Sequence, residues 1–258
     1  MKPYSFISIA IILLMLSGSL KAQEGAEAIF DKAVDRMLTN QLELSMHIET
    51  TDNRGRVTER EYDILMARFG DSDKMRMIMQ QPERAKGITV IITREAGETG
   101  VIEVFTPSNG KVRKMKATPE NLARVGSGFV LSDYASQAQE EMDFSLIGSE
   151  VVDGSSCYVL EARDADNPSA NLAKFLVEEQ TYHIRQIQVV NETGEMVNIT
   201  HLSEFQSVEG ISGKVYPIHI QSENFEEQSV TRMQILRVIH RPEVQEGDFV
   251  LEPVAEGS

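Results

Sequence analysis

The chain has 258 residues, of which 41% are hydrophobic and 25% are charged, and its formal net charge at pH 7 is −15. This composition is that of a globular protein, and it excludes collagen-like, disulfide-rich and wholly disordered chains. An acidic surface repels phosphate backbones and anionic lipid headgroups, so we expect no nucleic acid as a partner. The single cysteine can form neither an internal disulfide nor a cysteine-rich metal site.

Residues 1–22 are typical of a secretory signal peptide. Lys2 gives a positive start, residues 6–16 form an apolar run, and Ala22 can precede a cleavage site. The run is much shorter than the roughly 20 residues that span a bilayer. We therefore predict an exported chain with a cleavable signal, and an uncleaved N-terminal anchor is the alternative. Without a linker or a repeat in the rest of the sequence, residues 23–258 are expected to form a single domain.

Residues 25–40 predict one amphipathic helix, because apolar residues recur at helical spacing and Asn40 can end it. After it the period of the apolar residues changes from 3.6 to 2, which is typical of strands separated by Gly, Asn, Asp and Pro turns. Thr118-Pro119-Glu120 resembles a helix start and opens a helical insert at 119–141, with Phe129 in a loop. The segments expected to be extended are 42–48, 56–69, 75–79, 88–92, 101–106, 112–116, 144–152, 157–163, 173–179, 184–191, 196–205, 215–223 and 230–240.

This order of elements predicts a mainly β protein (α+β), because the strands follow one another without the βαβ alternation of a parallel sheet. We expect a single curved antiparallel sheet of roughly eleven strands. One face of such a sheet must be buried, either on a helix or around a ligand. Since little helix is available, the sequence favours an unclosed half-barrel with a helical lid.

A search for catalytic and metal-binding patterns is negative. The sequence has no phosphate-binding loop, no dinucleotide-binding glycine motif and no G-x-S-x-G elbow. The histidines are scattered, and although His201 could approach His219 in a sheet, we expect both on the sheet surface. Cys157 lies in an apolar strand and is expected to be buried and unreactive. The acidic pairs 140–141, 178–179 and 226–227 are interpreted as solvated faces. We therefore predict no metal, no cofactor and no enzymatic activity.

Methionine is frequent, and Met75, Met77 and Met79 alternate along one strand. Methionine is flexible and polarizable and suits surfaces that accommodate variable apolar partners. This stripe is either ordinary core packing or the wall of an apolar cavity. On the second interpretation, with Phe129 as part of a lid, the cavity lining is predicted to be Leu44, Met46, Ile48, Met75, Met77, Met79, Val90, Ile92, Val104, Phe129 and Phe144.

Several segments resemble the exported family of outer-membrane lipoprotein-sorting proteins, which is related to the lipoprotein carriers LolA and LolB. Residues 77–87 show the family's strand, then proline, then Lys-Gly; residues 104–114 show its basic hairpin; and residues 126–135 are similar to its Gly-Ser-Asp insert, with Gly128 where Asp is frequent. Residues 178–194 are similar to its paired strands with a glycine turn, and Asp248-Phe249 fits its end. The resemblance extends over about residues 25–252.

This resemblance implies an unclosed β-barrel with helices plugging its mouth, located in the periplasm and associated with the outer membrane. It implies binding of a lipid acyl chain or a lipoprotein rather than catalysis, by a protein expected to be monomeric. A lipid-exporting membrane transporter is a further partner that it implies. The carriers tether the lid through a strand arginine, and Arg54, Arg56 and Arg60 lie in the corresponding region without matching a specific motif.

Two other functions compete with a carrier. A non-catalytic adaptor could dock on a membrane transporter through its acidic face, and it would take up no lipid dye. A hydrolase would need a nucleophile and a base that the sequence does not display.

Overall fold

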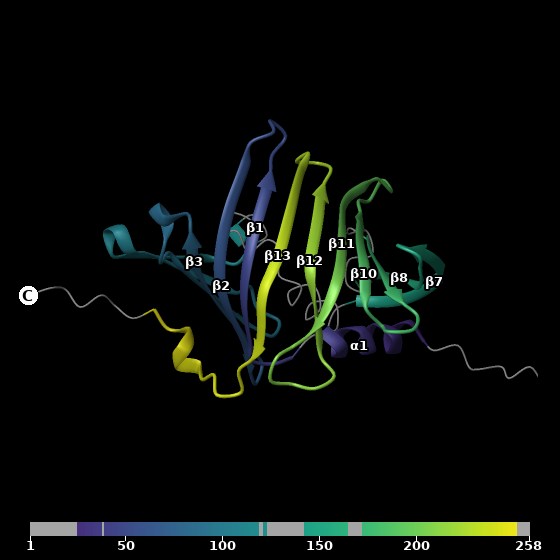
Figure 1. Ribbon diagram of the computed structural model, residues 1–258, viewed down its shortest axis with the longest axis horizontal. Helices are drawn as coiled ribbons and strands as arrows, with labels where there is room; N and C mark the ends of the chain where they lie inside the picture. The colour runs from purple at the N-terminus through teal and green to yellow at the C-terminus, as the bar shows by residue number, and fades with distance from the viewer. Residues whose placement is uncertain (1–24, 38, 119–120, 123–141, 165–171, 252–258) are drawn as a thin grey trace, which may run out of the picture.

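The architecture is a single large antiparallel sheet with one α-helix against it (Figure 1). The computed structural model describes residues 25–37, 39–118, 121–122, 142–164 and 172–251. Within them α1 spans Ala26–Met37, and the sheet has thirteen strands. The strands are β1 Leu42–Thr51, β2 Val57–Phe69, β3 Ser72–Gln81, β4 Thr89–Glu95, β5 Val101–Thr106, β6 Lys111–Lys116, β7 Met142–Val152, β8 Ser155–Asp164, β9 Leu172–Glu178, β10 Ile184–Val190, β11 Met196–Ser207, β12 Val215–Asn224 and β13 Ser229–His240. Three short 3-10 turns, η2 Glu83–Ala85, η3 Pro107–Asn109 and η4 Glu246–Phe249, complete the described elements.

The predicted fold class is confirmed, but the expected number of about eleven strands is too low. Each alternating segment of the sequence forms a strand of its own, including the short hairpin of β5 and β6 around Gly110. Gly110 has a φ of 64°, which glycine adopts without the clash of a Cβ atom. The signal segment and most of the predicted helical insert, including Phe129, lie outside the described residues.

The sheet is built from two meanders that meet in its centre. Strands β1 to β6 follow one another on one side, strands β7 to β13 follow one another on the other, and β1 pairs with β13 between them. The outer strands β6 and β7 are not paired with each other in the sheet, so it remains unclosed. In Figure 1, β2, β1, β13 and β12 stand side by side in the middle of the sheet.

The main hydrophobic core lies on the face of the sheet that carries α1. In β1, Leu42, Leu44, Met46 and Ile48 are buried, and the residues between them are only partly buried. This alternation is what a strand with one buried face requires. From α1 the side chains of Ile29, Phe30, Ala33, Val34 and Met37 join the same core. We call this the inner face of the sheet.

A smaller core lies on the outer face, where the chain after β13 crosses back over the sheet. Val244 and Phe249 pack there against Leu65, Ala67 and Ile91. Lys74 pairs with Glu246, and Arg76 donates a hydrogen bond to the carbonyl of Asp248. The C-terminal segment thus supports β2 to β4 from behind, and leaves their inner face to the site described next.

Candidate functional site

A cavity of about 380 Å³ lies where the C-terminal half of α1 faces the inner side of β1 to β4. Its volume is within the range of roughly 300–1,000 Å³ that is usual for small-molecule sites. The cavity is lined by Asp31, Val34, Asp35, Thr39, Asn40, Leu42, Met66, Ala67, Arg68, Asp73, Lys74, Met75, Ile92, Arg94, Ala117 and Leu122.

The floor of the cavity is apolar because the strand register aligns one row of large side chains. Leu42 is opposite Met66, Met66 is opposite Met75, and Met75 is opposite Ile92. Residues at paired positions on one face lie next to each other across the strands. Val34 of α1 and Leu122 add apolar surface to the lining. An apolar surface of this kind favours a hydrocarbon group over a polar ligand.

The rim of the cavity is charged, and several of its side chains hold each other in place. The guanidinium of Arg68 donates two hydrogen bonds to Asp73, at 2.7 and 2.9 Å. The side-chain amide of Asn40 makes two hydrogen bonds with the backbone of Arg68. It donates to the carbonyl at 3.0 Å and accepts from the N–H at 2.6 Å. Asp35 pairs with Lys214 at 2.8 Å. The rim therefore links the residues after α1 to the ends of β2 and β3.

Phe129 lies outside the described residues; the other predicted lining residues lie on the inner face, but only some of them reach this cavity. Met75 and Ile92 line it directly. Leu44, Met77 and Val90 are buried one row farther along the strands, and Val104 is opposite Val90. Met46 and Ile48 are buried as well, and Met79 is partly buried against the same core. That these residues contact a ligand stays a prediction.

Phe144 is not part of the lining of this cavity and packs against α1 instead. Its ring stacks on Phe30 of α1 with a centroid distance of 4.3 Å, and Phe30 also contacts Phe175 at 4.9 Å. These three rings join α1 to β7 and β9. Phe144 is thus part of the packing that positions the helix.

Sequence reasoning missed most of the lining residues that do not belong to a strand with alternating apolar and polar residues. Val34 and Asp35 are brought to the cavity by α1 and Leu122 by the chain after β6, whereas the rim charges Arg68 and Asp73 come from the ends of β2 and β3. Leu42 and Met66 continue the alternation of β1 and β2, so their inner orientation could be read from the sequence. Their meeting with Met75 depends on the register, which the sequence pattern does not specify.

The interpretation of 178–179 as a solvated acidic pair is wrong for Glu178, which is only 9% exposed. Its carboxylate accepts hydrogen bonds from Thr181 at 2.7 Å and from Arg185 at 2.7 and 3.0 Å. Burial raises the pKa of Glu178, but these hydrogen bonds outweigh that effect and hold its pKa below the ordinary value. The pattern failed because it does not show that the guanidinium of Arg185, at the start of β10, lies over Glu178 at the end of β9.

The other polar residues that the sequence offered as site candidates, Cys157, His201 and His219, are buried or bonded to neighbouring side chains in the sheet. Cys157 is fully buried, and burial raises the pKa of its thiol. His219 pairs with Glu204 at 3.2 Å, whereas His201 lies 3.2 Å from the side-chain amide of Gln186.

Over the residues that the structure describes, no group of three or more His, Cys, Asp or Glu side chains could hold a metal ion. In the same residues no helix has both the length and the apolar character of a membrane span.

Solved structures share this fold over almost their whole length. A domain from Vibrio parahaemolyticus described as an outer membrane lipoprotein-sorting protein superposes with a TM-score of 0.72 at 16% identity, covering 87% of this chain and 95% of that one. A DUF1329 family protein from Desulfovibrio piger gives a TM-score of 0.70 at 17% identity, covering 88% and 98%. A LolA superfamily protein from Nitrosomonas europaea gives 0.67 at 16% identity, also covering 88% and 98%.

The fold is therefore a LolA-like unclosed β half-barrel. A family model with the description "-like: Uncharacterized protein" matches residues 71–253, which is more than half of the chain, and the chain belongs to that family. No curated protein sequence matches the chain. The family description states no activity, so the function has to be argued from the site.

Proposed function

We propose that this protein is a periplasmic carrier that holds an acyl chain on the inner face of its half-barrel. It would take part in the sorting of outer membrane lipoproteins or in lipid transport. The observation that carries this proposal is the cavity under α1, with an apolar floor of Leu42, Met66, Met75 and Ile92 and a charged rim. The shared fold with the lipoprotein-sorting domain and the LolA superfamily protein supports it.

The energetics of a hydrocarbon ligand agree with this role. Each buried methylene contributes about 0.8 kcal/mol, so a sixteen-carbon chain has roughly 10 kcal/mol available before the costs of ordering are subtracted. The cavity accommodates part of such a chain, and the predicted lining residues Leu44, Met77 and Val90 extend the apolar surface beyond it on the same face. We propose that these residues contact the acyl chain once α1 or the residues around it have moved.

Binding is proposed instead of catalysis. The described lining of the cavity contains no serine, cysteine or histidine that could act as a nucleophile or imidazole base. Export through the predicted signal at 1–22, a single lipid-binding domain at 23–258, a monomeric state and a membrane transporter as a partner belong to the same proposal.

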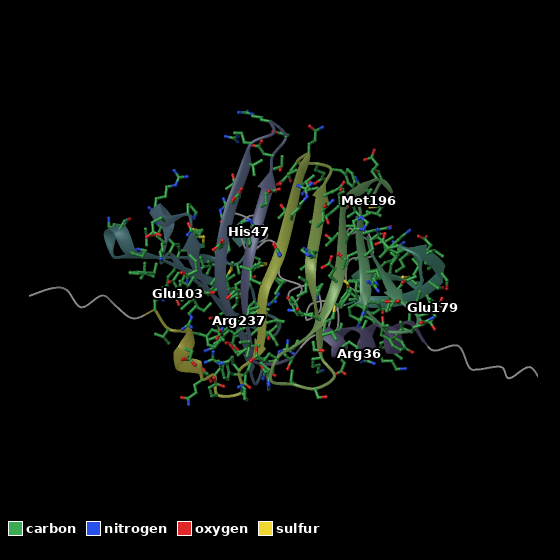
Figure 2. All side chains as sticks on the ribbon, viewed as in Figure 1. Arg36, His47, Glu103, Glu179, Met196 and Arg237 are labelled. Carbon is green, nitrogen blue, oxygen red and sulfur yellow. The ribbon has the colours of Figure 1, made fainter. Side chains whose placement is uncertain are left out.

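Binding of a fluorescent fatty acid to Met75→Glu, with Met196→Glu as the matched control, tests the site. A carboxylate placed on the apolar floor must be desolvated by a hydrocarbon ligand, so we expect Met75→Glu to weaken binding by at least about tenfold. Met196, at the start of β11, is exposed (labelled in Figure 2), and its replacement is expected to leave binding unchanged. Equal affinities for the two variants would refute the location of the site.

Native mass spectrometry of the protein purified from its own host tests the activity itself. Acyl ligands released on extraction are expected. A ligand-free mass under gentle conditions, no uptake of the fluorescent fatty acid, and co-purification with a membrane complex would together favour the adaptor function instead.

A further inference from the structure

Positive charge is concentrated at the edge of the sheet that β6 forms. Residues 83–87 and 101–116 contain only two acids but six of the chain's cations, which are Arg84, Lys86, Lys111, Arg113, Lys114 and Lys116. Over the whole sequence acids outnumber cations, 40 to 25. The two segments adjoin, because a Cβ atom added at Gly87 would lie 3.2 Å from the side chain of Pro107. We call residues 83–87 and 101–116 together the basic edge.

Most of the charge of the basic edge is not neutralised by neighbouring carboxylates. Lys86 pairs with Glu83 at 3.7 Å, and Lys114 pairs across the β5–β6 hairpin with Glu103 at 2.6 Å (Glu103 is labelled in Figure 2). The cations without an ion pair among the described residues are Arg84, Lys111, Arg113 and Lys116. In β6 every side chain except that of Met115 is exposed. An excess of accessible positive charge therefore remains at this edge.

The cations of β6 surround an edge of the sheet and do not share a single face. β6 is the last strand on its side of the sheet, and neighbouring residues in a strand point to opposite faces. Lys111 and Arg113 therefore lie on one face and Lys114 on the other, with Val112 43% exposed among them. Lysine and arginine have long apolar stems, so cations from both faces can reach a flat surface that meets the edge.

The basic edge also lies at one end of the apolar floor of the cavity. The register places Ile102 opposite Ile92 and Met115 opposite Ile102, so the row of the floor continues as far as β6. Ala117 and Leu122, which follow β6 in the chain, line the cavity themselves. A surface that meets this edge is therefore adjacent to the proposed hydrocarbon site.

We propose that the basic edge docks the protein on the surface of a membrane rich in anionic phospholipids. Each lysine or arginine near such a surface strengthens binding roughly fivefold. Charges farther than about 10 Å away are largely screened at about 0.1 M salt, so the acidic remainder of the chain opposes docking only weakly. The same cations could attract an acidic polypeptide, but the continuity with the apolar floor favours a lipid surface. Docking goes beyond acyl binding and can fail without it.

Sedimentation with vesicles of phosphatidylcholine, alone or mixed with phosphatidylglycerol, tests the docking. The native chain is expected to bind only the vesicles that contain phosphatidylglycerol. Raising the salt from about 0.1 M to about 1 M shortens the screening length from about 10 Å to about 3 Å and should release the chain. Binding that persists at the higher salt would refute the proposal without any variant. Lysines that merely hinder strand pairing at a sheet edge would give no vesicle binding at all.

A triple variant removes unpaired cations from β6. Lys111→Gln/Arg113→Gln/Lys116→Gln is expected to weaken binding to the mixed vesicles at least about tenfold. Lys111→Arg/Arg113→Lys/Lys116→Arg retains the three charges and should bind like the native chain. Far-ultraviolet circular dichroism verifies that both variants fold.

The matched control removes the same number of cations from the outer face of β8 and β13. It is Arg163→Gln/Arg232→Gln/Arg237→Gln, whose side chains are each about half exposed (Arg237 is labelled in Figure 2). Its net charge equals that of the glutamine variant of β6, yet its binding to the vesicles should not fall.

The possible failures are distinguishable. If the native chain ignores the mixed vesicles, or if the glutamine variant of β6 binds them as strongly as the control, docking through the basic edge is refuted. Retention on polyglutamate without vesicle binding would refute the membrane and indicate an acidic polypeptide as the partner. Binding of a fluorescent fatty acid in solution should be the same for all these proteins. Its absence in the native chain would refute the carrier function and leave the docking to be judged by the vesicles alone.

Discussion

Phe30 is the residue of α1 whose truncation should reveal how the helix is held on the sheet. Its side chain is 1% exposed and contacts the rings of Phe144 and Phe175 at centroid distances of 4.3 and 4.9 Å. Replacing a fully buried phenylalanine by alanine costs about 3–5 kcal/mol, and each aromatic contact accounts for about 0.5–1.5 kcal/mol of this range beyond burial of area. We therefore expect Phe30→Ala to lower the free energy of unfolding by about 4 kcal/mol.

Urea unfolding followed by far-ultraviolet circular dichroism measures this loss, because the chain has no tryptophan for fluorescence. For a protein of this size, about 4 kcal/mol corresponds to a fall of roughly 8–16 °C in the melting temperature. The dependence of the unfolding free energy on urea should stay the same, since the surface exposed on unfolding barely changes.

Leu236→Ala is the control, since Leu236 is 54% exposed in β13 and its truncation is expected to cost less than about 0.5 kcal/mol. A loss below about 1 kcal/mol for Phe30→Ala would show that the three rings do not pack as described. The three rings would then not be what holds α1 over the cavity.

Two further predictions concern buried titratable groups. The pKa of Glu178 is lower in the folded chain than its ordinary value of 4.5, so its contribution to stability is fully present above pH 4.5 and disappears as the pH falls through the folded pKa. Melting temperatures between pH 7 and pH 3 should therefore fall more steeply for the native chain than for Glu178→Gln, and parallel curves would contradict the ion pair with Arg185. Because burial raises the pKa of Cys157, a thiol reagent at pH 8 should react with it only in denaturant, and rapid reaction of the folded chain would disprove its burial.

The fold could be predicted from the sequence because nearly every strand faces the core on one side only. The alternation of Leu42, Leu44, Met46 and Ile48 with partly buried residues identifies such a strand directly. Turn residues such as Gly110 mark where the chain reverses. The number of strands was underestimated, although each predicted segment was a strand.

The site was less accessible to sequence reasoning because it depends on pairings between distant segments. Met75 and Ile92 were predicted from their place in an alternating strand, but their neighbour Leu42 comes into the same row only through two successive registers. Bulges add to the difficulty, since one extra residue reverses the face of everything beyond it. The register of β10 shifts at Arg185. The pairing of Arg185 with the buried Glu178 also joins two different strands, and the sequence pattern did not indicate it.

The contact between β1 and β13 in the middle of the sheet has a consequence for the order in which the chain can fold. Each meander consists of neighbouring hairpins and can form from local contacts as the polypeptide emerges. One edge of β1 stays unpaired until β13 has been synthesised, almost two hundred residues later. Until then the nascent protein presents an open template for strand addition by other chains. Loss of the last strand would therefore split the molecule into two incomplete sheets, and the fold depends on release of an intact C-terminus.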